Sequence, residues 1–299
     1  MSKLNKLKDT FTALLTPFDS NGEIDWDSFK NFLKFQINNG VGLLPCGTTG
    51  ESATLSHEEH HKVIEFTVEL AKESKKDPFV LAGTGSNSTK EAISLTQYAE
   101  KAGADGALVI IPYYNKPTQK GLIEHFKAIA KSTELPIVIY NVPSRTACNI
   151  LPETTAELAK IPNIVGYKAA DGNIEQIKKV IELTPDDFIV MSGDDNLTYD
   201  IMKSGGKGVI SVASNIIPDK VMKMTQLINA KKFEEGKKIF NELLDLFKVL
   251  FIETNPTPVK FAAEIMGLMK RYVRLPLVPP EPESQEKIKE VLKKLNLIK

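Results

Sequence analysis

The chain has 299 residues, of which 42% are hydrophobic and 25% are charged, as in an ordinary globular protein. Lys plus Arg and Asp plus Glu both number 38, so the formal net charge is zero, and we expect neither nucleic-acid binding nor attachment to an anionic membrane. Cys46 and Cys148 lie far apart in the sequence, so we expect no disulfide framework. Residues 1–6 are charged and no apolar run follows them, so we expect no signal peptide and no membrane span. A cytoplasmic location is the expectation that follows.

Short apolar runs alternate with longer amphipathic runs over the first 230 residues, which is typical of strands followed by helices. The predicted strands are 11–15, 42–45, 79–82, 107–111, 137–140, 164–168, 188–191 and 208–212. The predicted helices are 25–38, 57–73, 90–101, 119–131, 153–160, 174–182, 197–203 and one that begins near 218.

Eight strand–helix units in series predict an α/β fold of the closed (β/α)₈ barrel type, with a catalytic barrel over residues 1–229. The alternative is a doubly wound open sheet, which usually carries a glycine fingerprint after its first strand. Here Thr16-Pro17-Phe18 follows the first strand, so the barrel is favoured. Beyond residue 229 the alternation stops, and predicted helices at 231–252, 258–266 and 285–295 form a C-terminal helical region, 230–299.

The sixth predicted strand, Ile164-Val165-Gly166-Tyr167-Lys168, ends on a lysine. A lysine removed from water loses its charge more readily than one in solvent, and the neutral amine attacks carbonyls to form a Schiff base. The alternative is that Lys168 lies just past the strand and extends into solvent. The residues that follow the other strands decide between these interpretations.

In a barrel of this type the active site lies at the carboxyl ends of the strands. Hydroxyls, phenols, an arginine and a turn with exposed amides follow the other predicted strands, and such a turn can hold a carboxylate. These groups are Gly47–Ser52 after strand two, Tyr113 and Tyr114 after strand four, Tyr140 to Thr146 at strand five, Gly193 to Asp195 after strand seven and Ser211 at strand eight. Together with Lys168, the set predicts a site for a 2-oxo acid held as an imine.

The sequence also resembles a known family. Six motifs carry the resemblance: GTTGES at 47–52, PYYN at 112–115, YNVPSRT at 140–146, GYKAADGN at 166–173, SGDD at 192–195 and NPTPVK at 255–260. They are similar to those of the 4-hydroxy-tetrahydrodipicolinate (dihydrodipicolinate) synthases, within the pyruvate-dependent class I aldolase superfamily that includes N-acetylneuraminate lyase. One departure is Ala169, where many synthases carry glutamate.

The resemblance implies four catalytic residues and no cofactor or metal. Lys168 would form the Schiff base with pyruvate. Thr48, Tyr140 and Tyr114 would relay protons, with Tyr114 reaching across a dimer interface into the neighbouring subunit's site. The family likewise implies a homotetramer built as a dimer of dimers.

The resemblance also implies the substrate contacts. Thr48 and Thr49 would hold the pyruvate carboxylate, and Arg145 would bind the carboxylate of L-aspartate 4-semialdehyde. Gly193 and Ile210 would line the pocket through their backbone groups. The enamine of pyruvate would add to the aldehyde, and ring closure by the amino group would release Lys168, in the diaminopimelate route to lysine.

Two other functions are alternatives to that of a synthase. The first is a lyase or keto-sugar-acid aldolase of the N-acetylneuraminate lyase kind, which releases pyruvate. The Ser-Arg-Thr sequence at 144–146 argues against it, because sialic-acid lyases usually lack that sequence. The second is a catalytically silent binding barrel, against which the complete set of lysine, tyrosines and threonines argues.

The sequence His57-Glu58-Glu59-His60-His61 matches the H-E-x-x-H zinc pattern. We expect no zinc, because Ser56 and Glu59 form a capping box that places His57 in the first helical turn. The resemblance gives another interpretation, in which lysine binds as a feedback inhibitor at the dimer interface. The residues that match this inhibitor site are Ser52, Ala53, His57, His60, Asn87, Glu91 and Tyr113.

Two glycine-rich segments resemble nucleotide loops. Residues 83–85 lack a third glycine at the right spacing, and residues 203–208 precede a strand where a phosphate loop would follow one. We therefore predict a barrel loop and a helix end at these two places.

Overall fold

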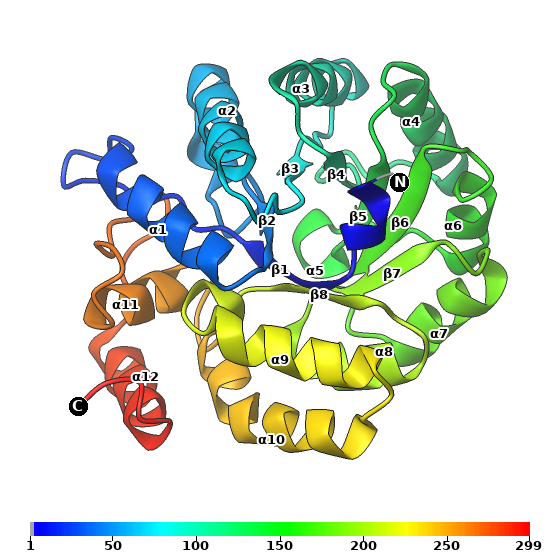
Figure 1. The fold of residues 1–299 in the computed structure, drawn as a ribbon. Helices are drawn as coiled ribbons and strands as arrows, with labels where there is room; N and C mark the ends of the chain where they lie inside the picture. The colour runs from blue at the N-terminus through cyan, green and yellow to red at the C-terminus, as the bar shows by residue number, and fades with distance from the viewer. Residues whose placement is uncertain (1–2) are drawn as a thin grey trace.

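The computed structural model describes residues 3–299. Residues 1–2, part of the charged start on which the expectation of no signal peptide rests, lie outside the described residues. Eight parallel strands form one sheet in the order β2-β1-β8-β7-β6-β5-β4-β3 (Figure 1). The strands are β1 (Asp9–Ala13), β2 (Gly42–Leu44), β3 (Leu81–Gly83), β4 (Gly106–Ile110), β5 (Ile137–Asn141), β6 (Ile164–Ala169), β7 (Ile189–Ser192) and β8 (Gly208–Ser211).

The two edge strands, β2 and β3, come together and nearly close the sheet. A parallel bridge joins Leu43 to Val80, and the Leu43 N–H donates to the Phe79 carbonyl at 2.9 Å. The predicted (β/α)₈ barrel is therefore confirmed, and the doubly wound open sheet is wrong.

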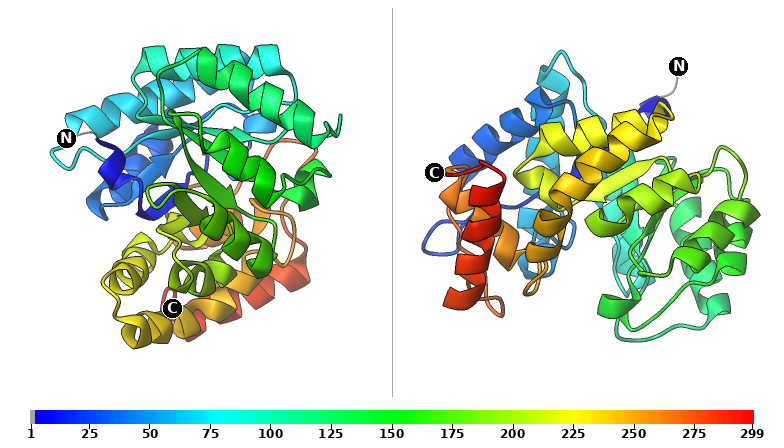
Figure 2. Two further views of the ribbon diagram at one scale, coloured as in Figure 1. Left: turned by 90° about the vertical axis from the view of Figure 1, so that its right-hand side faces the viewer. Right: turned by 90° about the horizontal axis from the view of Figure 1, so that it is seen from below.

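Helices follow the strands and surround the barrel (Figures 1 and 2). They are α1 (Trp26–Asn38), α2 (His57–Glu73), α3 (Thr89–Ala102), α4 (Gln119–Lys131), α5 (Pro143–Thr146), α6 (Pro152–Leu158), α7 (Ile174–Leu183), α8 (Thr198–Lys203) and α9 (Pro218–Asn229). Helix α5, a single turn directly after β5, was not predicted from the sequence. As predicted, α8 ends at Lys203, before the glycine-rich segment.

The barrel has two hydrophobic cores because successive strand residues point to opposite sides of the sheet. The inner core fills the barrel and includes Phe11, Leu44, Leu108, Met191 and Ile210. The outer core lies between the strands and the helices and is much larger. Packing on both faces fixes the strand ends, and so fixes the side chains that follow them.

The first strand begins two residues earlier than its apolar run predicts. Thr10 and Thr12 are fully buried in β1, where the Thr10 hydroxyl hydrogen-bonds Thr225 at 2.9 Å and the Thr12 hydroxyl donates to Gln36 at 2.8 Å. Because each hydroxyl has a partner, a polar residue is tolerated on the helix-facing side of the strand. A search for apolar residues therefore places the strand too late.

Three further helices, α10 (Phe233–Val249), α11 (Thr257–Ile265) and α12 (Pro282–Lys294), complete the described chain. Helix α10 packs against α8 and α9, and α12 packs against α10 and α11 on one side of the barrel (Figure 1). The division at residue 229 stays a prediction. None of the helices in residues 3–299 has the length and apolarity needed to cross a membrane.

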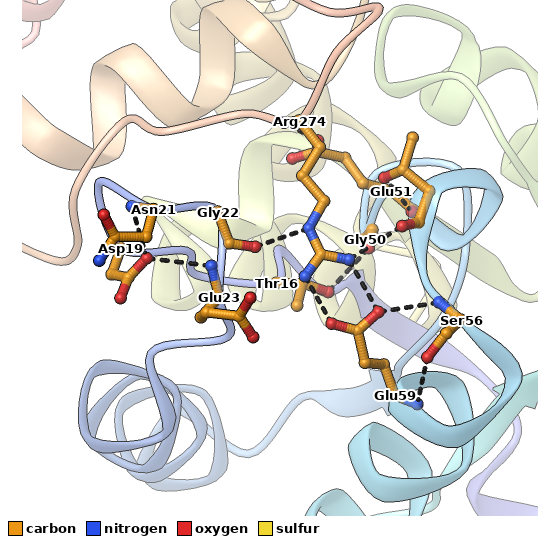
Figure 3. Close-up of polar contacts among 11 residues, drawn as sticks. Thr16, Asp19, Asn21, Gly22, Glu23, Gly50, Glu51, Ser56, Glu59 and Arg274 are labelled. Carbon is orange, nitrogen blue, oxygen red and sulfur yellow. Dashed lines mark hydrogen bonds and ion pairs between the residues drawn. The ribbon is translucent and has the colours of Figure 1, made fainter.

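Arg274, in the segment between α11 and α12, ties this region to the barrel (Figure 3). Its guanidinium pairs with Glu59 through two hydrogen bonds of 2.8 and 2.5 Å. It also donates to the carbonyls of Gly22 at 2.7 Å and Thr54 at 2.9 Å, and it lies 4.4 Å from the centre of the Phe18 ring. A planar fork that meets a carboxylate in this way is the strongest geometry available to an ion pair.

Glu59 also belongs to the predicted capping box at the start of α2. Its side chain accepts from the Ser56 N–H at 2.8 Å, and the Ser56 hydroxyl accepts from the Glu59 N–H at 3.2 Å. The hydrogen bonds from Arg274 hold the pKa of Glu59 at about 2, below its ordinary value of 4.5. A single carboxylate thus secures both the helix start and the C-terminal region.

The change Glu59→Gln keeps the capping group and removes the charge, and we expect it to lower the free energy of unfolding by about 2 kcal/mol at pH 7. Because the folded pKa lies below the unfolded one, this stabilisation is full above pH 4.5 and disappears as the pH falls towards 2. Chemical denaturation at several pH values checks both effects.

The control is Glu283→Gln, which removes an exposed pair with Lys287 and should leave the free energy of unfolding nearly unchanged, because solvent screens such a pair. Equal effects of the two substitutions would contradict the role given to Glu59.

Candidate active site

Lys168 lies near the carboxyl end of β6, between Tyr140 of β5 and Met191 of β7. Only 6% of the residue is exposed. Its ammonium nitrogen lies 4.0 Å from the centre of the Tyr140 ring. The alternative in which this lysine extends into solvent is therefore wrong.

The surroundings of Lys168 favour the neutral amine. Burial lowers its pKa from 10.5 to about 8, and the charge of Arg145 adds to this, while Asp194 and Asp195 oppose it. At pH 7 a group with a pKa of 8 is neutral in roughly a tenth of molecules, against fewer than about one in a thousand at 10.5. The site thus holds an amine ready for attack on a carbonyl.

Two carboxylates after β7 lie close enough to act on this amine. Asp195 is buried and accepts from the backbone N–H groups of Val212 at 2.9 Å and Ala213 at 3.0 Å. Burial raises the pKa of Asp194 to about 6, although the charge of Lys168 opposes the rise. The sequence analysis placed both residues at this end of the barrel but gave them no function.

Gly193, the residue before Asp194, allows the chain after β7 to pass close to Lys168. A Cβ at this position would lie 3.0 Å from Cε of Lys168 and 2.9 Å from the Ala169 carbonyl oxygen. Its N–H donates to the same carbonyl at 2.6 Å. A larger residue here would therefore displace the amine.

Tyr140 and Thr48 form the next part of the site. Tyr140 is buried, and burial raises the pKa of its phenol to about 12 although a hydrogen bond with the Thr48 hydroxyl opposes the rise. Both residues line a small cavity of about 50 Å³. Lys168 does not line this cavity, but it lies against the ring of Tyr140, which does. The Lys168 amine and the Thr48 hydroxyl thus both neighbour Tyr140, and the predicted proton relay among the three stays a prediction.

The turn after β2 contains two neighbouring backbone amides that take no part in its internal hydrogen bonds. Within residues 3–299, nothing accepts a hydrogen bond from the N–H of Thr48 or Thr49. The Thr49 hydroxyl accepts from the Asn255 amide at 3.0 Å. Two adjacent free N–H groups form the kind of concave site that binds an anion.

Arg145 comes from the short helix α5. Its guanidinium donates to the Asn255 carbonyl at 3.4 Å, and it lines a cavity of about 460 Å³ together with Thr48. Ile210 is completely buried in β8 and belongs to the inner core. The structure therefore gathers Lys168, Tyr140 and Thr48 closely, and places Arg145 at the larger opening.

Tyr114 is the exception among the predicted catalytic residues. It is 88% exposed, adopts a left-handed backbone with φ of 71°, and lines neither of these cavities. The structure thus does not bring Tyr114 into the site of its own chain. Its predicted reach into a neighbouring subunit stays a prediction.

The predicted inhibitor residues share the larger cavity with Arg145. Of the seven, Ser52, Ala53, His57, His60, Glu91 and Tyr113 line it. Asn87 does not, and its carbonyl instead accepts from the Asn115 amide at 2.9 Å. The cavity therefore joins the opening of the candidate active site to six of the residues expected around lysine.

Glu91 already has two partners in this cavity. Its carboxylate hydrogen-bonds His57 at 2.8 Å and accepts from the Ser86 hydroxyl. His60 is buried and hydrogen-bonds the Gly83 carbonyl at 2.9 Å, and burial lowers its pKa to about 4. His61, the second histidine of the zinc pattern, stacks on Tyr98. No group of three or more His, Cys, Asp or Glu suited to a metal occurs in the described chain.

Asn255 and Lys260 contact the site although the sequence analysis gave neither a function. Asn255 contacts both Thr49 and Arg145. Lys260 pairs with Glu51 at 2.5 Å, and both side chains are fully buried. Lys260 is the one charged residue before Glu264 in the otherwise apolar run of α11, and this isolation was a usable signal.

Comparison with known proteins gives a consistent result. The model of the dihydrodipicolinate synthetase family matches residues 6–295. The 4-hydroxy-tetrahydrodipicolinate synthase of Syntrophus aciditrophicus is 51% identical over 292 residues, which cover 97% of this chain and 99% of that protein.

Two solved structures are also similar. The chloride-inhibited dihydrodipicolinate synthase of Acinetobacter baumannii, in complex with pyruvate, aligns with a TM-score of 0.95 at 41% identity and covers 98% of this chain and all of its own. The enzyme of Cyanidioschyzon merolae with lysine bound aligns with a TM-score of 0.95 at 37% identity and covers 98% of this chain and 99% of its own.

The ¹³Cε resonances of labelled lysines test the environment of Lys168. We expect one resonance, absent in Lys168→Met, to titrate with a pKa near 8. The change Asp194→Asn should lower this pKa further, because it removes a negative charge that favours the ammonium form. Lys260, which is paired with Glu51, serves as the control, and its pKa should be the same in Asp194→Asn as in the wild type. Titration of Lys168 near 10.5 would refute the assignment.

Proposed function

The chain belongs to the dihydrodipicolinate synthetase family, and from this we infer that it is a 4-hydroxy-tetrahydrodipicolinate synthase. Such an enzyme condenses pyruvate with L-aspartate 4-semialdehyde in the diaminopimelate route to lysine. The observation that carries the proposal is the buried amine of Lys168 against the Tyr140 phenol, at the end of the barrel where substrates bind.

The reaction begins with the neutral amine of Lys168, which attacks the ketone carbon of pyruvate. The resulting carbinolamine loses water as Tyr140 and Thr48 pass a proton to the departing oxygen, and the product is a protonated imine. The pyruvate carboxylate lies on the free N–H groups of Thr48 and Thr49. This places the ketone carbon towards the amine and replaces the hydration of the carboxylate.

The relay of Tyr140 and Thr48, having given up a proton, takes one from the methyl group and converts the imine to an enamine. The enamine carbon adds to the aldehyde, whose oxygen takes this proton back from the relay. Arg145 binds the carboxylate of the aldehyde by a forked pair of hydrogen bonds. The amino group of the former aspartate semialdehyde then attacks the imine carbon and closes the ring, and the Lys168 amine leaves. Gly193 and Ile210 line the pocket, and Gly193 keeps space for the lysine.

A complete site takes Tyr114 from a second subunit, and the assembly is a homotetramer arranged as a dimer of dimers in the cytoplasm. The high exposure of Tyr114 supports this arrangement, since a phenol that projects from one chain is available to its neighbour. Its proposed place is at the end of the relay formed by Tyr140 and Thr48.

Lysine acts as a feedback inhibitor in the larger cavity, as the lysine-bound relative from Cyanidioschyzon merolae supports. Glu91 binds the α-ammonium of lysine, and His57 and His60 bind its side-chain end. Ser52, Ala53, Asn87 and Tyr113 complete the surrounding surface. Because Thr48 and Arg145 line the same cavity, a bound effector can alter the substrate side directly.

Borohydride reduction in the presence of pyruvate tests the activity. We expect a stable increase in mass on Lys168 and none in Lys168→Met. In a separate assay without borohydride, we expect the enzyme to condense pyruvate with L-aspartate 4-semialdehyde. Sugar aldehydes such as N-acetylmannosamine should react at least about a hundredfold more slowly, because a site built for a second carboxylate is poorly satisfied by a neutral sugar. Labelling without preference for the semialdehyde would indicate a lyase, and absence of labelling would exclude both enzymes.

The change Glu91→Ala tests the effector site. We expect it to abolish inhibition by lysine and to leave kcat and both KM values within about twofold, because the Glu91 carboxylate hydrogen-bonds Ser86 and His57, neither of which is a predicted catalytic residue. Steady-state rates over a range of lysine concentrations are the measurement. Glu65→Ala, on the same side of the barrel but bonded to Tyr98, is the control and should be inhibited normally. Full inhibition of Glu91→Ala would refute the site.

A further inference from the structure

The turn at residues 47–52 holds its two free amides in fixed directions. The Gly47 carbonyl accepts from the N–H groups of Gly50 at 3.1 Å and Ser52 at 3.4 Å, and the Thr48 carbonyl accepts from the Glu51 N–H at 3.1 Å. A peptide unit is planar and trans, so its N–H points opposite to its C=O. These bonds on the Gly47 and Thr48 carbonyls therefore aim the N–H groups of Thr48 and Thr49 away from the turn.

Glu51 is the residue on which this arrangement depends. Its own N–H makes the bond to Thr48, and its backbone adopts the left-handed conformation with φ of 54°, which is uncommon for a residue with a side chain. Both oxygens of its carboxylate are held from the C-terminal region. Lys260 pairs with Oε1 at 2.5 Å, and the Arg274 N–H donates to Oε2 at 3.0 Å.

Lys260 lies in the core, away from the predicted catalytic residues. Its side chain is completely buried in α11, its ammonium donates to the Tyr272 carbonyl at 2.7 Å, and it lies 4.2 Å from the centre of the Phe18 ring. None of these groups touches Lys168 or Tyr140. A buried ammonium needs a counter-charge, and Glu51 is the carboxylate with which it is paired.

We propose that Lys260 is a positioning residue for the carboxylate-binding turn. Through its ion pair with Glu51 it fixes the directions in which the N–H groups of Thr48 and Thr49 point, and so determines how tightly the enzyme binds pyruvate. The inference rests on the proposed function, in which these N–H groups hold the pyruvate carboxylate. On this proposal, a residue of the C-terminal helical region positions a substrate-binding turn of the barrel.

Loss of Lys260 lowers stability, because the Glu51 charge is left buried without its partner. It also removes the contact that holds Oε1 of Glu51 in place, so the side chain is free to shift whether or not it is charged. The Glu51 N–H moves with it, the Thr48 carbonyl is released, and the peptide units that present the two N–H groups rotate. Binding of the pyruvate carboxylate weakens. Attack by Lys168 on bound pyruvate is unaffected, because the amine lies against the Tyr140 ring, and neither residue belongs to the turn.

The test compares Lys260→Met, the double variant Glu51→Gln with Lys260→Met, and the control Lys287→Met, which removes an exposed pair on α12. In Lys260→Met we expect the KM for pyruvate to rise roughly tenfold, with kcat and the KM for L-aspartate 4-semialdehyde within about threefold. The double variant leaves no unpaired charge, so its Tm should recover, while its KM for pyruvate should stay raised. The control should match the wild type in all of these values.

A purely structural pair predicts a different result. In that case the double variant would regain wild-type KM for pyruvate together with its Tm, and the proposal would be overturned. An unchanged KM for pyruvate in Lys260→Met would overturn it as well. Should Lys260→Met fail to fold, the double variant decides the question by the same criterion.

Borohydride trapping separates this inference from the proposed function. At saturating pyruvate, Lys168 should be labelled in the wild type and in every Lys260 variant, whereas half-maximal labelling should need roughly tenfold more pyruvate in the variants. No labelling of the wild type would refute the Schiff-base mechanism itself. Labelling at the same pyruvate concentration in wild type and variants would refute only the positioning role of Lys260.

Discussion

Burial of one amine is the constraint on which the site depends. Lys168 lies near the end of a strand that is covered on both faces, against the Tyr140 ring, and removal from water lowers its pKa to about 8. Asp194 and Asp195 act in the opposite direction and limit the change. Desolvation supplies enough neutral amine for attack at neutral pH, while the nearby carboxylates can stabilise the positive charge of an imine.

The second requirement is a place for the substrate's carboxylate beside that amine. We propose the turn after β2 for this role, because it has two free backbone N–H groups and the C-terminal region holds it from outside the barrel. Asn255, Lys260 and Arg274 make these contacts across more than 200 residues of sequence. The helices after α9 therefore contribute to the geometry of the site as well as to stability.

The alternation of strands and helices was enough to predict the barrel, because each periodic run is a local property of the sequence. The lysine near the end of β6 and the motifs around it predicted the candidate active site. Local reasoning failed where tertiary partners decide the outcome. The buried threonines of β1 have hydroxyl partners on distant helices, and the one-turn helix α5 is too short for periodicity to reveal.

The same limit explains the site residues that were missed. The contacts of Asn255 and Lys260 join residues about 200 positions apart, and no pattern within one segment encodes such a pairing. The exposed position of Tyr114 likewise depends on a left-handed backbone and on whatever chain lies beside it. Residues that act from their own strand end were predictable, and residues that act through another element were not.

A crystal structure of the borohydride-reduced complex with pyruvate is the most direct test of the central claim. The account predicts continuous density from Lys168 Nζ to the former ketone carbon, with the carboxylate on the N–H groups of Thr48 and Thr49 and the Tyr140 phenol beside the reduced carbon. Density on another lysine, or a carboxylate bound away from the turn at 47–52, would contradict it.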